Sequence, residues 1–265
     1  MKTPQPRNRK PTIITVSHVR HLTPNMIRVT FAGPEVAALS SHGAGDYCKL
    51  FLPQAGQSMA DFERQLEDGP RPDVRTYTVR QLRASQGEMD IDFVDHGENG
   101  PASAWAMHAK TGSFCGLAGP NPLKRATFDA DYFIVAADMS ALPMAAATLE
   151  ALPKDAIGTA LFEIETEADK QAIDAPAGVT ITWLVSDDPA CPGPATVAKV
   201  LGMEWPTGQV KTCIAGESTM AKTLREYILG DKGVPRENAY ISGYWKLGLM
   251  EDEHKIFKSG ESRRG

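Results

Sequence analysis

The sequence predicts two domains: a small six-stranded antiparallel β-barrel, followed by a doubly wound, mostly parallel α/β sheet. Three observations support this prediction. The first half has short segments rich in Val, Ile and Thr that alternate with turn residues, as in small barrels. The second half alternates apolar strands with helices, as in doubly wound sheets. Gly and Pro are concentrated at 119–122, where a boundary is expected between domains 1–122 and 123–265.

The first domain is expected to contain six strands and one helix that interrupts them. Residues 23–25 (Thr-Pro-Asn) are a turn signal between the first two strands. The polar segment 55–71 is expected to be a loop with a short helix. Pro101 suits the first position of a helix over 101–109, because an N–H at that position would have no partner inside the helix. The expected strands are 12–18, 26–31, 46–52, 75–82, 88–95 and 112–119.

The second domain is expected to place its ligand-binding residues at the carboxyl ends of its strands, as doubly wound sheets do. Polar residues follow the strands there, at 137–140, 163–167, 186–188 and 216–219. Ser140 precedes an apolar helical pattern and is expected to cap that helix. The expected strands are 132–137, 160–164, 179–185, 210–215 and 239–242, and the expected helices are 141–152, 195–201 and 219–229.

Composition indicates a globular protein that acts in the cytoplasm. Of 265 residues, 42% are hydrophobic and 23% are charged. No apolar run reaches the roughly 20 residues that span a bilayer, and the first ten residues lack the apolar core of a signal peptide. The net charge of -5 argues against a nucleic acid partner. The four cysteines form no C-x-x-C, and the six histidines show no metal-ligand spacing, so no protein-borne metal site is expected.

The segment 74–80 combines an arginine, a tyrosine and threonines on one expected strand. Side chains alternate along a strand, which places Arg75 and Tyr77 on one face and Thr76 and Thr78 on the other. Arg75 can bind a phosphate through two parallel hydrogen bonds, and Tyr77 can lay its ring along a flat ligand. The alternative is an ordinary amphipathic strand with charged ends.

The start of the expected helix over 101–109 is a second candidate for phosphate binding. It follows a turn at 97–100 and carries Ser103 in its first turn. A helix N-terminus offers backbone N–H groups, and the Ser103 hydroxyl adds another donor. The alternative is a surface helix that closes the barrel.

Six stretches together carry a resemblance to one family: 46–50, 75–78, 92–97, 100–106, 215–218 and 243–248. They span nearly the whole chain, and the last one, Gly-Tyr-Trp-Lys-Leu-Gly, is the most distinctive. In this order they resemble the siderophore-interacting proteins. These are FAD-dependent ferric-siderophore reductases with the ferredoxin-reductase-like fold.

The resemblance implies an FAD site in the first domain. Residues of the strand at 75–78 would hold the isoalloxazine, the ribityl chain and the phosphates. Residues at 92–96 would lie along the same cofactor, although His96 alone is more often structural. The start of the helix would present amides and a hydroxyl to the pyrophosphate. The implied cofactor-binding residues are Arg75, Thr76, Tyr77, Thr78, Asp92, Phe93, His96, Ala102, Ser103 and Ala104.

The resemblance also implies the reaction, which is reduction of a ferric siderophore with release of Fe(II). No acid–base residue or protein metal ligand is required, and a monomer is expected. Basic residues would hold an anionic chelate, namely Lys49, Lys246 and one or both of Lys124 and Arg125. The alternatives are a general flavin or ferredoxin reductase and a siderophore-binding protein without turnover.

The electron donor is expected to be NADH, NADPH or a ferredoxin. The turn at 137–143 lacks the glycines of a typical nicotinamide domain, and Asp138 would repel a pyrophosphate that faced it. The acidic strand end at 163–167 favours NADH over NADPH, because carboxylates suit a ribose 2′-OH and oppose a 2′-phosphate. The charged tail at 249–265 is expected either to fray or to form a short helix with a Glu251–Lys255 pair. A further hypothesis is that it screens donor access to the flavin.

Overall fold

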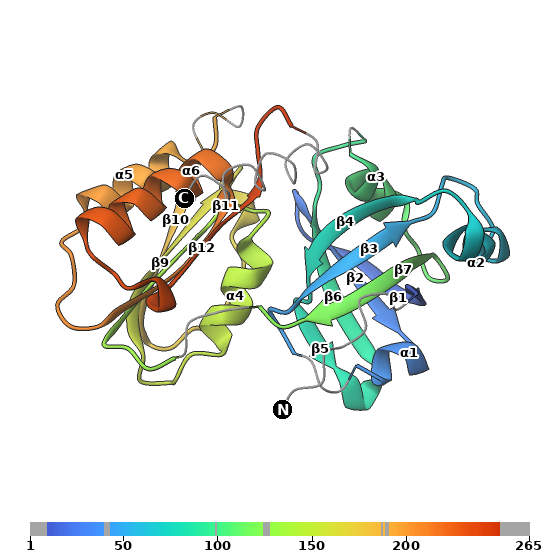
Figure 1. Ribbon diagram of the computed structural model, residues 1–265, viewed down its shortest axis with the longest axis horizontal. Helices are drawn as coiled ribbons and strands as arrows, with labels where there is room; N and C mark the ends of the chain where they lie inside the picture. Colours follow the sequence, from blue (N-terminus) through green and yellow to red (C-terminus); the bar gives the residue numbers. More distant parts are fainter. Residues whose placement is uncertain are drawn as a thin grey trace. The chain divides into compact units, whose positions relative to one another are not determined.

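The computed structural model describes residues 10–39, 43–98, 100–123, 128–186, 188 and 191–249. Lys124, Arg125 and the Glu251–Lys255 pair lie outside these ranges. The chain divides into two compact units, residues 1–123 and 124–265, and each has its own sheet (Figure 1). We refer to them as the barrel unit and the α/β unit. Among the described residues, no helix combines the length and apolar character needed to cross a bilayer.

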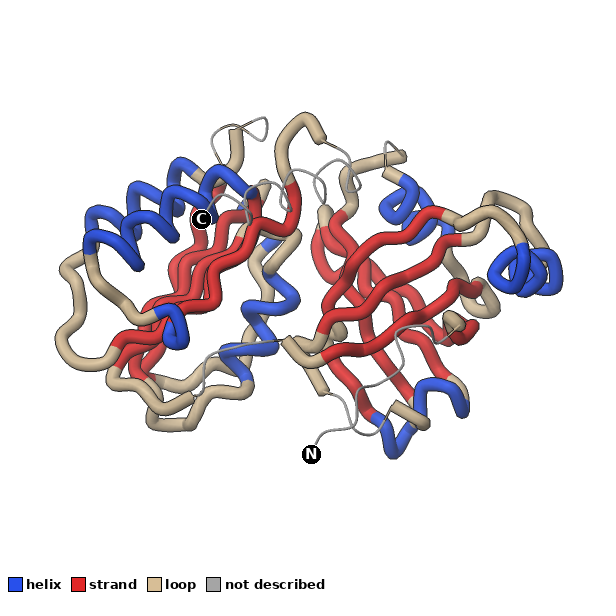
Figure 2. The backbone as a smooth tube through the Cα atoms, in the orientation of Figure 1, coloured by secondary structure: helices blue, strands red, loops and turns tan. Residues whose placement is uncertain are grey.

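The barrel unit is built on one sheet, whose strands are red in Figure 2. They pair antiparallel in the order β4-β3-β7-β1-β2-β6-β5. Its helices are α1 (Pro34–Ala37), α2 (Met59–Asp68) and α3 (Pro101–His108), with a 3-10 turn η1 (Ala84–Gln86). The strands are β1 (Thr12–Thr23), β2 (Met26–Ala32), β3 (Tyr47–Leu52), β4 (Asp73–Thr78), β5 (Gln81–Arg83), β6 (Glu88–Val94) and β7 (Phe114–Asn121). The predicted antiparallel first half is confirmed.

The predicted count of six strands is wrong, because the expected strand 75–82 is two strands. The chain changes its pairing partner at Val79 and Arg80. The N–H of Val79 donates to the Asp46 carbonyl at 2.8 Å, and the N–H of Arg80 donates to the Asp90 carbonyl at 2.9 Å. Strands β4 and β5 stand at opposite ends of the sheet order. Two residues therefore bring the two ends of the sheet together.

The core of the barrel unit is formed by alternate residues of these strands. Val29 and Phe31 on β2 and Ile91 and Phe93 on β6 are fully buried. Leu50 on β3 joins them in the same cluster. The period of two along each strand directs these side chains to one face of the sheet, and burying them stabilises the curved sheet.

The α/β unit is a parallel sheet in the order β10-β9-β8-β11-β12. Figure 1 shows α5 and α6 on one face and α4 on the other, which confirms the doubly wound prediction. The strands are β8 (Tyr132–Ala137), β9 (Ile157–Ile164), β10 (Gly178–Val185), β11 (Val210–Glu217) and β12 (Ala239–Trp245). The helices are α4 (Leu142–Glu150), α5 (Pro194–Gly202) and α6 (Ser218–Arg225), with short turns η2 (Glu167–Asp169), η3 (Glu226–Asp231, π-helical) and η4 (Arg236–Asn238).

The strand order reverses between β8 and β11. From β8 the chain runs outward through β9 to β10, and it then returns to the other side of β8 to form β11 and β12. The carboxyl ends of β8 and β11 therefore form the topological switch point, which is where doubly wound sheets bind ligands.

Candidate functional site

Tyr77 is held by a row of aromatic rings that crosses the barrel unit. Its ring centroid lies 4.4 Å from that of Phe93 on β6, with 40° between the planes. Phe93 packs in turn on Trp105 of α3 at 5.7 Å, and Trp105 stacks on Phe31 of β2 at 6.1 Å. Tyr77 itself is only half-buried against this core. The row fixes the ring of Tyr77 from one side and leaves part of it accessible.

Arg75 shares the face of β4 that carries Tyr77, as the alternation predicts. Tyr77 pairs with Cys48 and Arg75 pairs with Leu50, and both partners are buried. The guanidinium of Arg75 donates to the Val74 carbonyl at 3.0 Å. The guanidinium therefore contacts its own strand.

The opposite face of β4 carries the threonines. Thr76 is exposed and Thr78 is buried. Lys49 on β3 lies directly across from Thr76, so the two side chains share this face. Lys49 and Tyr77 therefore lie on opposite faces of the sheet.

Helix α3 begins without a capping side chain. Its N-cap residue is Gly100 and its first residue is Pro101, which has no N–H. The N–H of Ala104 donates to the Gly100 carbonyl at 2.9 Å. The N–H groups of Ala102 and Ser103 then remain as first-turn donors without a partner inside the helix. This arrangement suits a negatively charged group.

The start of α3 is tied to the end of β6. The buried hydroxyl of Ser103 accepts a hydrogen bond from the backbone N–H of His96 at 3.2 Å. The His96 ring is exposed and lies against Gly100, where a Cβ would come within 2.7 Å of the ring. The predicted residues on β6 and α3 therefore lie side by side.

Asp92 binds two arginines. Its carboxylate accepts two hydrogen bonds from Arg28 at 2.7 and 2.8 Å, and Arg80 lies 4.0 Å away. Sequence reasoning missed Arg28. The cross-strand register could have found it, since β2 and β6 pair Arg28 with Asp92 and Thr30 with Asp90. In the structure, Asp92 connects these strands and orients two cations.

At the switch point of the α/β unit, Asp138 connects three strand ends. One carboxylate oxygen accepts hydrogen bonds from the N–H and the hydroxyl of Ser140 at 3.0 and 2.6 Å. The other accepts from the Glu217 N–H and the Trp245 indole N–H, both at 2.8 Å. Burial raises the pKa of Asp138, although the bonds from Ser140 and Trp245 act in the opposite direction. The predicted Ser140 cap is wrong: the N-cap residue of α4 is Ala141, and Asp138 accepts the turn's N–H groups.

Glu217 binds both the start of α6 and Lys246, one of the basic residues predicted to hold the chelate. Its carboxylate accepts from the N–H groups of Thr219 and Met220. Burial acts to raise the pKa of Glu217, but these bonds outweigh it and the pKa is lowered. The ammonium of Lys246 lies 3.5 Å from Glu217 and 2.5 Å from the Thr219 hydroxyl. The protein thus holds the ammonium of Lys246, and 28% of that side chain remains exposed.

Glu163, at the end of β9, is bound at the start of the third helix of this edge. Its carboxylate accepts from the N–H of Gly193 at 2.7 Å and from the Thr196 hydroxyl at 2.8 Å. Gly193 is the N-cap residue of α5, and Glu163 is 4% exposed. The predicted role of this acidic strand end in holding a ribose therefore does not extend to Glu163, whose oxygens are bound within the protein.

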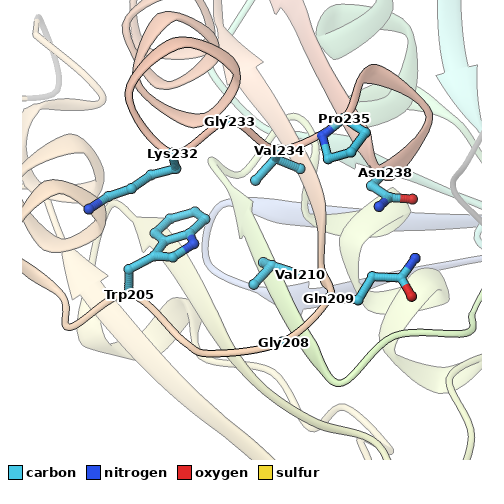
Figure 3. A pocket seen from close by; sticks show the side chains of 9 residues that line it. All are labelled: Trp205, Gly208, Gln209, Val210, Lys232, Gly233, Val234, Pro235 and Asn238. Carbon is cyan, nitrogen blue, oxygen red and sulfur yellow. The ribbon is translucent and has the colours of Figure 1, made fainter.

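A separate cavity of about 310 Å³ lies at the amino ends of β11 and β12 (Figure 3). The ammonium of Lys232 lies 5.5 Å from the Trp205 ring centroid and 5.1 Å from that of Tyr227. This end of the sheet is opposite to the switch point. The lining residues are Trp205, Gly208, Gln209, Val210, Lys232, Gly233, Val234, Pro235 and Asn238. Within the described ranges, no cluster of His, Cys, Asp or Glu has the geometry of a metal site.

Comparisons with known proteins match both units. Residues 15–123 match the model of the siderophore-interacting FAD-binding domain, and residues 130–248 match that of the siderophore-interacting protein. The ferric vibriobactin reductase of Vibrio cholerae is 32% identical over 252 residues, which cover 92% of each chain. The chain belongs to the siderophore-interacting protein family.

A second relative and a solved structure are also similar to this chain over most of its length. The NADPH-dependent ferric-chelate reductase of Escherichia coli is 28% identical, with 88% of this chain and 91% of that one covered. The crystal structure of the siderophore-interacting protein from Aeromonas hydrophila superposes with a TM-score of 0.83 at 29% identity. It covers 96% of this chain and 98% of that chain.

The barrel unit of this siderophore-interacting protein offers groups that suit an FAD. The half-buried ring of Tyr77, braced by Phe93, suits a flat ring system or its sugar-like chain. The uncapped first turn of α3, with the amides of Ala102 and Ser103, suits a pyrophosphate. Strand β6 connects the two, since Phe93 touches Tyr77 and His96 bonds to Ser103.

Proposed function

We propose that this protein is an FAD-dependent reductase of ferric siderophores that takes its electrons from NADH, NADPH or a ferredoxin. The observation that carries the proposal is the pairing of a braced Tyr77 with an uncapped α3 in a domain of the FAD-binding family. The names of two relatives, a ferric vibriobactin reductase and a ferric-chelate reductase, support the substrate class. In this proposal residues 1–122 hold the flavin and residues 123–265 receive the donor.

A bound flavin supplies the conversion between a two-electron hydride donor and one-electron ferric acceptors. One hydride therefore serves two ferric chelates, and the iron stays bound to its chelator as substrate until it is reduced. The chain's own part is to bind and orient. Tyr77 and Arg75 act from β4, the amides of α3 bind phosphate, and the Arg28–Asp92 pair keeps β2 and β6 in register.

The contacts of each predicted cofactor-binding residue suggest which role it has in this proposal. Phe93 is fully buried, so it supports Tyr77 from behind. Ser103 has its hydroxyl bonded to His96, so it offers its amide first. Asp92 binds Arg28 and Arg80, and we propose that it acts on the cofactor through those arginines.

Lys49 and Lys246 are proposed to attract an anionic ferric catecholate, with Lys124 and Arg125 as further candidates. Replacing Lys49 or Lys246 by Ala is expected to raise the KM for the chelate severalfold and to weaken its dependence on salt, because a screened attraction is lost. Lys199→Ala removes an exposed lysine of α5 and serves as the matched control. An unchanged KM in both variants would remove the two lysines from the proposal.

The central experiment is anaerobic. The flavin of the purified protein is reduced chemically, a ferric siderophore is added, and flavin absorbance is followed with an Fe(II) trap present. We expect reoxidation of the flavin together with trapped Fe(II). A flavin that stays reduced while the chelate binds would indicate a siderophore-binding protein, and a flavin that reoxidises only with ferredoxin or free flavin would indicate a general reductase.

A further inference from the structure

We infer that the α/β unit recognises its electron donor without binding a dinucleotide pyrophosphate, because its own carboxylates occupy the groups that bind one in related sheets. That the unit receives an electron donor rests on the proposed function. That its backbone N–H groups are occupied by carboxylates is independent of that function. Doubly wound sheets bind pyrophosphate at the switch point, through amides of a glycine-rich turn and a helix N-terminus.

In the turn from β8 to α4, the backbone donors from Ser140 onward are already bound. The N–H of Ser140 donates to the Asp138 carboxylate at 3.0 Å. The N–H groups of Ala141 and Leu142 donate to the Asp138 carbonyl at 3.1 and 2.9 Å. Pro143 has no N–H, and the next two N–H groups, at 144 and 145, donate to the Ala141 carbonyl. From residue 140 to residue 145, the turn has no amide left for a ligand.

The end of β11 shows what takes the place of a phosphate. Gly216 has φ +149, and a Cβ there would lie 2.5 Å from a carboxylate oxygen of Asp138. The same oxygen accepts the N–H of Glu217 at 2.8 Å. A glycine at such a turn normally lets a phosphate approach the backbone. In this protein the space beside Gly216 contains the carboxylate of Asp138.

The start of α6 is closed in the same way, whereas at α5 a carboxylate binds the N-cap residue and not the first-turn N–H groups. Glu217 accepts from the first-turn N–H groups of α6, at Thr219 and Met220. Glu163 accepts from Gly193 at the start of α5. All three carboxylates are buried, with 3–6% of each residue exposed. At the switch point formed by β8 and β11, a pyrophosphate would meet the carboxylates of Asp138 and Glu217 in place of these donors, so it lacks both space and hydrogen bonds there.

The donor must then be recognised by its other parts. For a dihydronicotinamide these are the ring and the attached ribose, and the hydride passes from the ring to the flavin, leaving an oxidised nicotinamide. We therefore expect dihydronicotinamide riboside, which has no phosphate, to reduce the flavin with a kcat/KM within tenfold of that for NADH. A preference for NADH of more than tenfold would overturn the inference.

A binding measurement separates this inference from the proposed function, because it needs no catalysis. Hydrogen–deuterium exchange is measured on the flavin-loaded wild-type protein with and without 5 mM ADP-ribose. We expect no added protection in peptides covering 138–145 and 216–220, including when ADP-ribose binds elsewhere on the chain. Protection of either peptide would overturn the inference. If neither nicotinamide reduces the flavin, the nicotinamide part of the proposed function fails, and the exchange experiment alone decides the inference.

Discussion

Asp138→Asn tests whether the switch point depends on hydrogen bonds to an ionised carboxylate. The amide replaces one accepting oxygen by an NH₂ group, which faces donors in either orientation. Facing Glu217 and Trp245, it would leave two donors without an acceptor. If the NH₂ group faces Ser140, only the Ser140 N–H is left unpaired. The Ser140 hydroxyl can rotate to accept from the NH₂ group, and the Ala141 N–H still donates to the backbone carbonyl of residue 138. The second orientation is expected.

The magnitude follows from that orientation. One unpaired backbone donor costs about 1–3 kcal/mol. The neutral amide also avoids the cost of burying a charge, which is the effect that raises the pKa of Asp138. A loss of stability in the lower part of this range is therefore expected. Trp245→Phe removes the indole donor and is expected to cost about 1 kcal/mol. Since the Asn oxygen still faces Trp245, the two changes are expected to be additive within about 0.5 kcal/mol.

The assay is urea unfolding followed by far-UV circular dichroism, on the wild type, both single variants and the double variant. A double variant that is more stable than the sum of the singles by over about 1 kcal/mol would place the NH₂ group against Trp245. An Asp138→Asn protein as stable as the wild type would refute the reasoning, since relief of the buried charge would then outweigh the hydrogen bonds.

Three further predictions concern the described parts of both units. Arg28→Met removes two hydrogen bonds to the buried Asp92 carboxylate and leaves it Arg80 at 4.0 Å, so it is expected to cost about 2–3 kcal/mol in urea unfolding, whereas a cost below about 1 kcal/mol would show that the pair is dispensable. Burial raises the pKa of Cys48 to about 12, so iodoacetamide at pH 8 should label the exposed Cys191 and leave Cys48 unlabelled by mass spectrometry; prompt labelling of Cys48 would contradict its burial. Burial acts to raise the pKa of Asp90, but hydrogen bonds from arginine and threonine lower it. Asp90 therefore contributes stability above about pH 4 that is lost as pH falls through the lowered value, and Asp90→Asn should flatten the acid side of the Tm–pH curve.

Local patterns in the sequence predicted the elements whose formation depends on nearby residues. The strand Tyr132–Ala137 was predicted to the residue, and Pro101 marked the start of α3. The break of 75–82 at Val79 was missed, because an extended segment keeps the same local pattern when it changes partner strands. Only the tertiary pairing of Val79 with Asp46 and of the next residue with β6 reveals it.

The site shows the same division. The absence of glycine at 137–143 indicated that this turn differs from that of a typical nicotinamide domain. The only role that the sequence predicted for Asp138 was repulsion of a pyrophosphate. The contacts of Asp138 with Glu217 and Trp245 join residues far apart in the sequence, so no local pattern could show them. The pairing of Arg28 with Asp92 likewise needs the register of two strands, although the alternation of both strands was visible.

The bond between Asp138 and Trp245 also sets an order of assembly during synthesis. Trp245 follows Asp138 by 107 residues, which a ribosome adds in about 5–20 s. For that interval the turn after β8 exists with one of its donors still missing, and β12 has not yet joined the sheet edge beside β11. Strand β12 therefore completes the turn after β8, and the switch point of the α/β unit reaches its final form only after Trp245 has been synthesised.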